Sequence, residues 1–325
     1  MYLFRLFALV AAISFTPWLA SMPATAQSYP TKPIRLILPF SAGAPSDMLG
    51  RLLSQKLSEQ LGQNIIPDNR AGAGGTVGIA AAAKMPADGY SLLLISPVIA
   101  LSPALYSNLS YDPVKDFETV ARVAAIDNVI LVHPSVPAKT LREFVALARS
   151  MPGKLNYGSG GVGTSNHLAN ELLKYNEKID IVHVPYKGAT LAAVALAGGE
   201  VDEVVVGLTT ALPLIKAGKV RALAILSEKR TPTLPDLPNA KEAGYPNFLI
   251  SSWYGLYAPA GTPRDIVMKL SLETQKAIDS AEIRERMAAM GISPWPGSSE
   301  ELGKLLKSEM ARYAAIVRSA GIKPQ

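Results

Sequence analysis

The stretch YGSGGVGTSNHL, residues 157–168, joins a short β-rich run to a helical pattern through a glycine-rich turn. A similar turn, SAGAPSD at residues 41–47, follows the β-rich run at residues 34–40 and also leads into a helical pattern. In open α/β sheets, ligands bind at the carboxyl ends of the strands. The two turns therefore predict two lobes, each with one glycine-rich strand-to-helix turn, that face one another and hold one ligand.

Such turns have the chemistry of an anion site. The first turn of a helix has unpaired backbone N–H groups and the positive end of the helix dipole, and glycines let a ligand approach that backbone. Three or four charge-assisted hydrogen bonds, at roughly 1.5–3 kcal/mol each, approach the ~8 kcal/mol of micromolar binding. We therefore expect an anionic small-molecule ligand and neither a metal nor a cofactor.

The second turn also has the G-x-G-x-x-G spacing of a dinucleotide-binding fingerprint. That fingerprint needs an acidic residue about 20 positions further on, at the end of the next strand. Asp180 has nearly this spacing, but it precedes the β-rich run at residues 181–184. It is expected to point away from the strand's carboxyl end, which disfavours a nucleotide ligand.

The N-terminus predicts export. Arg5 is the only charge before an apolar run at residues 6–20, and the small residues Ala24-Thr25-Ala26 precede Gln27. This is the pattern of a secretory signal peptide, residues 1–26, cleaved after Ala26. No later stretch reaches the roughly 18 uninterrupted apolar residues of a membrane span. We expect a periplasmic protein whose mature part suits two domains of roughly 100–200 residues each.

Composition excludes several classes of function. The chain has no cysteine, so disulfides, a lipid-modified cysteine and a thiolate mechanism are excluded. Its net charge is +6, but the basic residues are scattered and form no stripe for nucleic acid. Hydrophobic residues make up 49% of the chain, which is enough for two cores.

The order of the elements predicts an α/β fold with largely parallel sheets, because β-rich runs alternate with helical patterns. The β-rich runs are residues 34–40, 91–96, 128–132, 155–158, 181–184, 201–206 and 222–226. Ser298 and Glu301 have the spacing of a capping box before a long amphipathic helix. Thr262 and Pro263 predict another helix start, with Thr262 as the N-cap.

Two further segments predict how the lobes are joined. VARVAAIDNVILVHP at residues 120–134 and NFLISSWYGLYAP at residues 247–259 have the pattern of paired strands that cross between lobes. Lobe 1 is then a discontinuous α/β domain, residues 27–126 and 251–325, and lobe 2 is an α/β domain at residues 127–250.

The chain resembles the periplasmic substrate-binding proteins of tripartite tricarboxylate transporters, also called the Bug family. The motifs that carry the resemblance span the mature chain: YPTKPIRLILPFSAGAPSD, DNRAGAGGTVGIAAAAKMPADGYSLL, LNYGSGGVGTSNHLANELL, HVPYKGATLAAVALAGGEVD, IKAGKVRALAILSEKR and YGLYAPAGTP. The resemblance implies a two-lobed periplasmic-binding-protein (Venus flytrap) fold, with the ligand cleft between the lobes. It also implies binding of a carboxylate and delivery to membrane transporter subunits, not catalysis.

The same resemblance implies which residues bind the ligand. They lie in the two glycine-rich turns, with one weaker candidate after the third β-rich run: Phe40, Ser41, Ala42, Gly43, Asp47, Ser96, Ser159, Gly160, Gly161, Gly163 and Thr164. The chain departs from the usual family pattern at Ala44, at Val162 and at residues 201–211, which leaves the identity of the ligand open.

Asp47, the histidines and a further glycine-rich stretch each have more than one interpretation. Asp47 stands beside a predicted helix start, so its carboxylate caps backbone N–H groups or contacts the ligand. His167 is expected to be a packed or capping histidine, and His133 and His183 show no metal-ligand spacing. A third glycine-rich stretch, residues 69–75, either reaches the cleft or serves as a backbone turn with positive φ.

Two other functions stay open besides transport. An exported α/β hydrolase or isomerase would turn its ligand over, and a receptor of another kind would present its ligand to a sensor kinase. The expected partners are a small carboxylate ligand, membrane transporter subunits of the tripartite tricarboxylate type and, for a receptor of the other kind, a sensor kinase. We expect a monomer and no nucleic-acid partner.

Overall fold

The computed structural model describes residues 29–319. The predicted signal peptide and its cleavage site after Ala26 lie outside these residues. Within the described part, no helix combines the length and the apolar character that a membrane crossing would need.

The N-terminal third forms three parallel strands in the order β2-β1-β3. The strands are β1 (Ile34–Leu38), β2 (Ile65–Asn69) and β3 (Ser91–Ile95), and the helices between and after them are α1 (Pro45–Leu61), η1 (Ala73–Gly75), α2 (Thr76–Ala83) and α3 (Val98–Leu105). Leu49, Leu52, Leu53 and Leu57 recur at helical spacing on α1 and are buried, so this helix covers the sheet with one apolar face.

The middle of the chain repeats this plan with the parallel order β6-β5-β7. Its strands are β5 (Asn156–Ser159), β6 (Val182–Pro185), β7 (Glu203–Gly207) and β8 (Arg221–Ile225), and its helices are α4 (Leu141–Ser150), α5 (Ser165–Glu177), α6 (Ala189–Ala197) and α7 (Leu208–Lys216). It has its own core, in which Phe144, Tyr157 and Leu223 are buried together.

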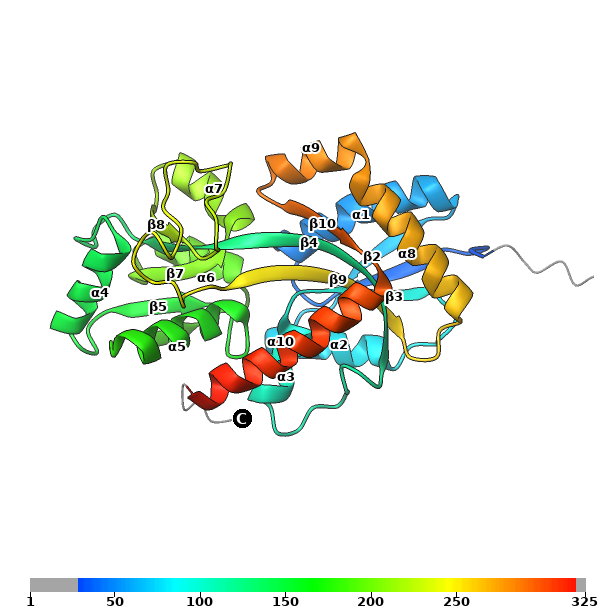
Figure 1. Ribbon diagram of the computed structural model, residues 1–325, viewed down its shortest axis with the longest axis horizontal. Helices are drawn as coiled ribbons and strands as arrows, with labels where there is room; N and C mark the ends of the chain where they lie inside the picture. Colours follow the sequence, from blue (N-terminus) through cyan, green and yellow to red (C-terminus); the bar gives the residue numbers. More distant parts are fainter. Residues whose placement is uncertain (1–28, 320–325) are drawn as a thin grey trace, which may run out of the picture.

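Two long strands connect these regions. β4 (Phe117–Val132) and β9 (Ser251–Pro259) pair antiparallel along the whole of β9, and β4 then continues to pair with β7 and β8. Figure 1 shows β4 and β9 passing side by side from one lobe into the other. The predicted pair of crossing strands is therefore confirmed, and the α/β fold is two-lobed.

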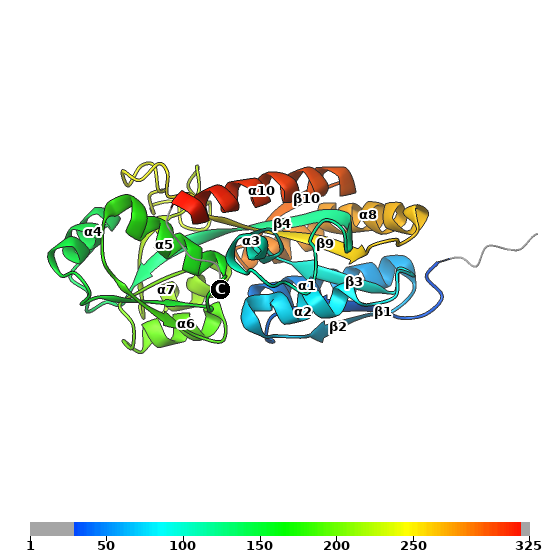
Figure 2. The same ribbon diagram turned by 90° about the horizontal axis from the view of Figure 1, so that it is seen from below.

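The C-terminal elements return to the first lobe, and the last helix packs along the crossing strands β4 and β9. They are α8 (Arg264–Asp279), α9 (Ala281–Ala289), β10 (Ser293–Gly297) and α10 (Ser299–Ser319). Figure 2 shows α10 lying along the crossing strands. The indole N–H of Trp253 in β9 donates to Glu309 in α10 at 3.3 Å, and Arg312 donates to the carbonyl of Leu249 at 3.3 Å.

Two local predictions need correction. The sheet is mixed and not largely parallel, because β4 is antiparallel to β7, β8, β9 and β10. Helix α8 begins at Arg264 with Pro263 in the N-cap position. Thr262 lies one residue too early to cap it, and its hydroxyl instead donates to the carbonyl of Pro259 at 2.7 Å.

Candidate functional site

The first glycine-rich turn, residues 40–47, is called loop 1. It connects β1 to α1, and its chain reverses at Gly43, which has a φ of 79°. The N-cap residue Ala44 offers no side-chain oxygen to the helix. The carboxylate of Asp47 fills this role from inside the first turn, where it accepts the N–H of Gly43 at 2.9 Å.

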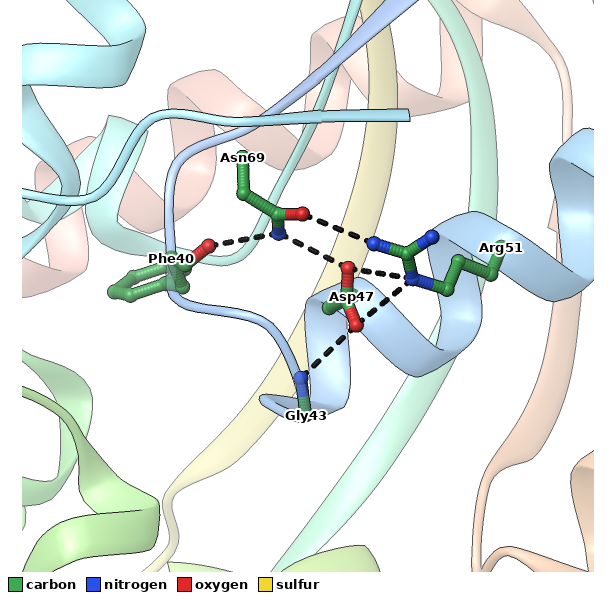
Figure 3. A network of polar contacts seen from close by, with 5 residues as sticks. All are labelled: Phe40, Gly43, Asp47, Arg51 and Asn69. Carbon is green, nitrogen blue, oxygen red and sulfur yellow. Dashed lines mark hydrogen bonds and ion pairs between the residues drawn. The ribbon is translucent and has the colours of Figure 1, made fainter. Parts of the chain in front are cut away.

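Asp47 also ties loop 1 to the end of β2. Its carboxylate accepts Nε of Arg51 at 3.0 and 3.1 Å and the amide of Asn69 at 3.0 Å, and the same amide donates to the carbonyl of Phe40 at 3.0 Å. Figure 3 shows Gly43, Arg51 and Asn69 around the carboxylate of Asp47, with Phe40 joined to it through Asn69. Burial opposes ionisation, but the hydrogen bonds from Arg51, Gly43 and Asn69 outweigh it and hold the pKa of Asp47 below its usual value.

Asp47 thus has the contacts of a structural cap, and its contact with a ligand stays a prediction. The side chains of Ser41 and Ala42 and the backbone of Gly43 are exposed. They form the part of loop 1 that a ligand can reach.

The third glycine-rich stretch, residues 69–75, forms a backbone turn with positive φ and also lies close to both other glycine-rich turns. Ala73, Gly74 and Gly75 all have positive φ, which glycine adopts freely and alanine rarely does, so the stretch is a backbone turn. A Cβ on Gly75 would lie 3.1 Å from the ring of Phe40, and one on Gly74 would lie 3.0 Å from the carbonyl of Val162 in lobe 2. The turn therefore packs on loop 1 and also approaches the second glycine-rich turn.

That second turn, residues 159–164, is called loop 2 and connects β5 to α5. Gly161 and Gly163 have φ values of 111° and 85°, which favour glycine at both positions. The Asn166 amide oxygen accepts the N–H groups of Gly160 at 3.4 Å and of His167 at 3.2 Å. This neutral oxygen holds the helix start where loop 1 uses a carboxylate.

Loop 2 leaves two backbone donors free at the start of a helix. The hydroxyl of Thr164 donates to the carbonyl of Gly161 at 2.7 Å, and the N–H of Gly161 donates to the hydroxyl of Ser159 at 3.1 Å. Across residues 29–319, the N–H groups of Val162 and Gly163 have no acceptor. With the positive end of the α5 dipole, these groups can bind an anion.

Lobe 1 contacts loop 2 through an aromatic residue that the sequence did not single out. Tyr106, directly after α3, donates its hydroxyl to the carbonyl of Val162 at 3.1 Å. A Cβ on Gly163 would lie 2.9 Å from the same hydroxyl. The side chain of Leu168 in α5 is buried in a cluster with Leu101 and Leu105 of α3. Residues of both lobes therefore contact loop 2 and the helix that follows it.

Ser96 lies at the carboxyl end of β3, beside the carboxyl end of β1 that leads into loop 1, and its contact with a ligand stays a prediction. It directly follows β3 and is buried, and its carbonyl accepts the N–H of Ile99 at 3.4 Å. In the described part of the chain, Ser96 makes no hydrogen bond to loop 1 or loop 2.

The rings of two histidines lie side by side beneath loop 2, and the sequence did not predict this pair. The ring of His183 in β6 lies 4.6 Å from the ring of His167 in α5, and its Nε2 lies 2.6 Å from Oγ of Ser159. Burial is the main cause that lowers the pKa of both histidines. Within residues 29–319, no group of three or more acidic or histidine side chains could hold a metal.

Asp180, the acidic residue with nearly the fingerprint spacing, lies before its strand, as expected from the sequence. Asp180 precedes β6 and accepts the N–H of Gly153 through its backbone carbonyl at 2.9 Å. Loop 2 stands at the opposite, carboxyl end of β5 and β6. The geometry therefore gives no support to a dinucleotide site.

Comparison with known proteins gives consistent matches along the chain. The model of the tripartite tricarboxylate transporter family receptor matches residues 49–322. A protein from the tcbD-tcbE intergenic region of Pseudomonas sp. strain P51 is 36% identical over 291 residues, 89% of this chain and 87% of that protein. The protein BugT of Bordetella pertussis is 34% identical over 321 residues, 98% of each chain.

Solved structures agree with the sequence matches. Rpa4515 of R. palustris with adipate superposes with a TM-score of 0.88 at 35% identity and covers 91% of this chain and 100% of that one. The periplasmic binding protein BugD gives 0.86 at 33% identity, with 91% and 100% covered. MatC of Rhodopseudomonas palustris with bound malate gives 0.84 at 33% identity, with 89% and 100% covered.

Proposed function

The chain belongs to the tripartite tricarboxylate transporter receptor family, and we propose that it captures a small carboxylate between loops 1 and 2 and delivers it to membrane subunits of such a transporter. The family consists of receptors, which confirms a solute-binding protein in place of an exported hydrolase or isomerase. Related structures are periplasmic binding proteins. We propose that residues 1–26 direct export, with cleavage after Ala26, and that the receptor acts as a monomer.

One observation carries this proposal: the free N–H groups of Val162 and Gly163 at the start of α5. They lie where Tyr106 and Gly74 of the other lobe approach. A carboxylate there would receive hydrogen bonds from a backbone that is already positioned, together with the favourable field of the helix dipole. No basic side chain is required.

The class of ligand is proposed from the bound neighbours. Rpa4515 is described with adipate and MatC with malate, and both are dicarboxylates. We propose a dicarboxylate for this chain, with one carboxylate at loop 2. Ser41, Ala42 and Gly43 of loop 1 are exposed and would contact the remainder of the molecule.

We also propose how the two lobes move. Lobe 1 would comprise residues 27–126 and 251–325 and lobe 2 residues 127–250, with β4 and β9 as the connection. The register pairs Ile126 with Ser252 and Asp127 with Ser251, so both proposed boundaries fall at one level of the crossing. A small change of backbone angles at this level would open and close the lobes about the ligand.

A panel of dicarboxylates tests the function. We expect one of malate, succinate, glutarate or adipate to raise the melting temperature, because a ligand that binds the native state stabilises it by about 2.7 kcal/mol at a hundredfold excess over its Kd. Small-angle scattering should show a more compact molecule, and NMR of the ligand should show no turnover. An unchanged scattering profile with a tightly bound dicarboxylate would refute closure, and consumption of the ligand would favour an enzyme.

A further inference from the structure

Ser159 links loop 2 to the neighbouring strand through a buried hydroxyl. The residue is fully buried at the end of β5. Its Oγ accepts the N–H of Gly161 at 3.1 Å and lies 2.6 Å from Nε2 of His183. Within the described residues, that nitrogen is the one acceptor offered to the hydroxyl proton. We infer that the Ser159 hydroxyl donates to His183, which requires the tautomer of His183 with no proton on Nε2.

The surroundings hold His183 in place and keep it neutral. Its ring stacks on the ring of Tyr157 at 4.8 Å and 17° and lies 4.6 Å from the ring of His167. Tyr157 is fixed in turn, because its hydroxyl donates to Glu171 at 2.7 Å, and Glu171 also accepts Lys174 at 3.0 Å. Burial, followed by the neighbouring His167, lowers the pKa of His183 to about 4.

The bond to Gly161 matters because it fixes one of two adjacent peptide groups. The N–H of Gly161 is held by Ser159, and the carbonyl of Gly161 is held by the hydroxyl of Thr164. Peptide groups are planar and trans, so the carbonyl of Gly161 and the N–H of Val162 point in opposite directions. Fixing both peptides around Gly161, whose φ is 111°, fixes where the N–H of Val162 points.

We propose that His183 is a positioning residue for the ligand site: through the hydroxyl of Ser159 it holds the Gly161 peptide, and so aims the free N–H groups of loop 2 at the ligand carboxylate. This role rests on the proposed function of loop 2. The group that His183 contributes is a neutral imidazole acceptor, two hydrogen bonds away from the Gly161 peptide, and not a charge.

Two substitutions at one position separate the hydrogen bond from packing. His183→Gln can keep an acceptor near the place of Nε2 but loses the aromatic stack on Tyr157. His183→Phe keeps the stack and loses the acceptor. With the panel's tightest dicarboxylate as the calorimetric probe, we expect His183→Phe to bind at least tenfold more weakly and His183→Gln to bind within about threefold of the unaltered protein.

Other results would overturn the proposal. Normal binding by His183→Phe would do so, and so would equal losses in both variants, since packing alone would then explain them. Gly163→Val separates this failure from failure of the proposed function. If loop 2 is the anion site but His183 does not position it, Gly163→Val loses binding and His183→Phe does not. If loop 2 is not the site, neither variant loses binding.

A second measurement needs no variant and no ligand, and so remains decisive if His183→Phe does not fold. Long-range ¹H–¹⁵N correlation spectra of the unaltered protein report which ring nitrogen of each histidine carries the proton. We expect His183 at pH 7 to be neutral, with its proton on Nδ1. A proton on Nε2 would show that Ser159 does not donate to the ring and would overturn the assignment.

Discussion

Loops 1 and 2 occupy the same place in their lobes, between the carboxyl end of a strand and the first turn of a helix, but they are held by different chemistry. Loop 1 is held by an ionised carboxylate, Asp47, and its Arg51 partner. Loop 2 is held by neutral groups: the amide of Asn166 and the Ser159–His183 pair.

This difference assigns the loops different tasks. In loop 1 the N–H of Gly43 already donates to an anion of the protein itself, at 2.9 Å, so a ligand anion at the N–H groups of Ser41 and Ala42, which have no acceptor within the described residues, would lie beside the charge of Asp47. In loop 2 the N–H groups of Val162 and Gly163 are free within the described residues, and no carboxylate forms part of the loop. We therefore expect loop 2 to supply most of the affinity for the ligand carboxylate, and loop 1 to shape the rest of the site.

The largest expected effect comes from Gly163→Val. Its φ of 85° is unfavourable for a β-branched residue, and a Cβ would lie 2.9 Å from the Tyr106 hydroxyl. Loss of two charge-assisted bonds, at roughly 1.5–3 kcal/mol each, should weaken dicarboxylate binding at least a hundredfold by calorimetry.

Gly43→Val is the matched change in loop 1. Gly43 has a similar φ of 79°, but a Cβ there meets nothing within 4 Å. We expect a loss below about tenfold, which corresponds to less than ~1.4 kcal/mol. Equal losses in the two variants would remove the distinction between the loops. Near-normal affinity in a folded Gly163→Val protein would show that loop 2 is not the anion site.

Asn166→Asp gives loop 2 the kind of charge that loop 1 already has. The new carboxylate can still accept the N–H groups of Gly160 and His167, and a negative charge in the first turn of α5 is favourable for the helix. Two like charges about 7 Å apart interact with about 2 kcal/mol at an effective dielectric constant of ~20. We expect roughly thirtyfold weaker dicarboxylate binding without loss of thermal stability; unchanged affinity would place the ligand carboxylate elsewhere.

The contrast extends to two of the buried carboxyl groups, Asp47 of loop 1 and Glu203 of lobe 2. Glu203 in β7 is fully buried, and within residues 29–319 neither oxygen has a hydrogen-bond partner of good geometry. Burial raises the pKa of Glu203 well above its ordinary value. The unfolded chain loses this proton near pH 4.3, whereas the folded protein keeps it to a higher pH. The contribution of this group to the free energy of unfolding is therefore largest below about pH 4.3 and falls as the pH rises above it.

Glu203→Gln should therefore stabilise the protein at neutral pH. The glutamine has the same shape, does not ionise in the unfolded chain, and can donate to the buried, unpartnered amide oxygen of Asn170. We expect denaturant unfolding at pH 7 to give at least about 1.4 kcal/mol more stability, the free energy of one pKa unit, and no gain at pH 4.

Asp47→Asn is the opposite case and serves as the control. Its folded pKa is lowered, so its contribution is present above the unfolded pKa and disappears as the pH falls. This variant should be less stable at pH 7 and similar to the unaltered protein in acid. If Glu203→Gln is less stable at both pH values, the buried carboxyl has partners that the contacts do not reveal.

Part of the fold could be predicted because burial and local pattern coincide. Continuous apolar runs such as residues 129–132 become parts of buried strands, and Ser298 with Glu301 forms the expected capping box at 2.7 and 3.2 Å. Strands β2 and β10 were missed. Their sequences, IIPDN and SPWPG, contain prolines and few apolar residues, so their pairing comes from neighbouring strands and not from local propensity.

The site shows the same limit. Positive φ at Gly163 follows from a glycine-rich turn before a helix, which is a local property. Ser159 and His183 are 24 positions apart and meet because β5 and β6 pair in parallel, with Tyr157 opposite His183. Tyr106 meets loop 2 across the two lobes. Neither contact has a spacing that a single sequence could reveal.

Tyr106→Phe is expected to have the smallest effect on binding, and it tests whether lobe 1 holds loop 2 in place. The hydroxyl of Tyr106 donates to the carbonyl of Val162, and burial raises its pKa further above the ordinary tyrosine value. The phenylalanine ring can keep the contact with Gly163 and loses this one bond. A neutral hydrogen bond contributes roughly 0.5–1.5 kcal/mol, so dicarboxylate binding should weaken about two- to tenfold.

If the Tyr106 bond forms when the lobes close, its loss should appear as faster dissociation in stopped-flow measurements, with association nearly unchanged. Tyr186→Phe is the control, because the Tyr186 hydroxyl meets Glu200 within lobe 2 at a long 3.5 Å. It should leave both rates unaltered. Equal effects from the two tyrosines would mean that neither acts through closure. An unchanged dissociation rate in Tyr106→Phe would leave loop 2 to hold the carboxylate without help from lobe 1, and would sharpen the contrast between the two loops further.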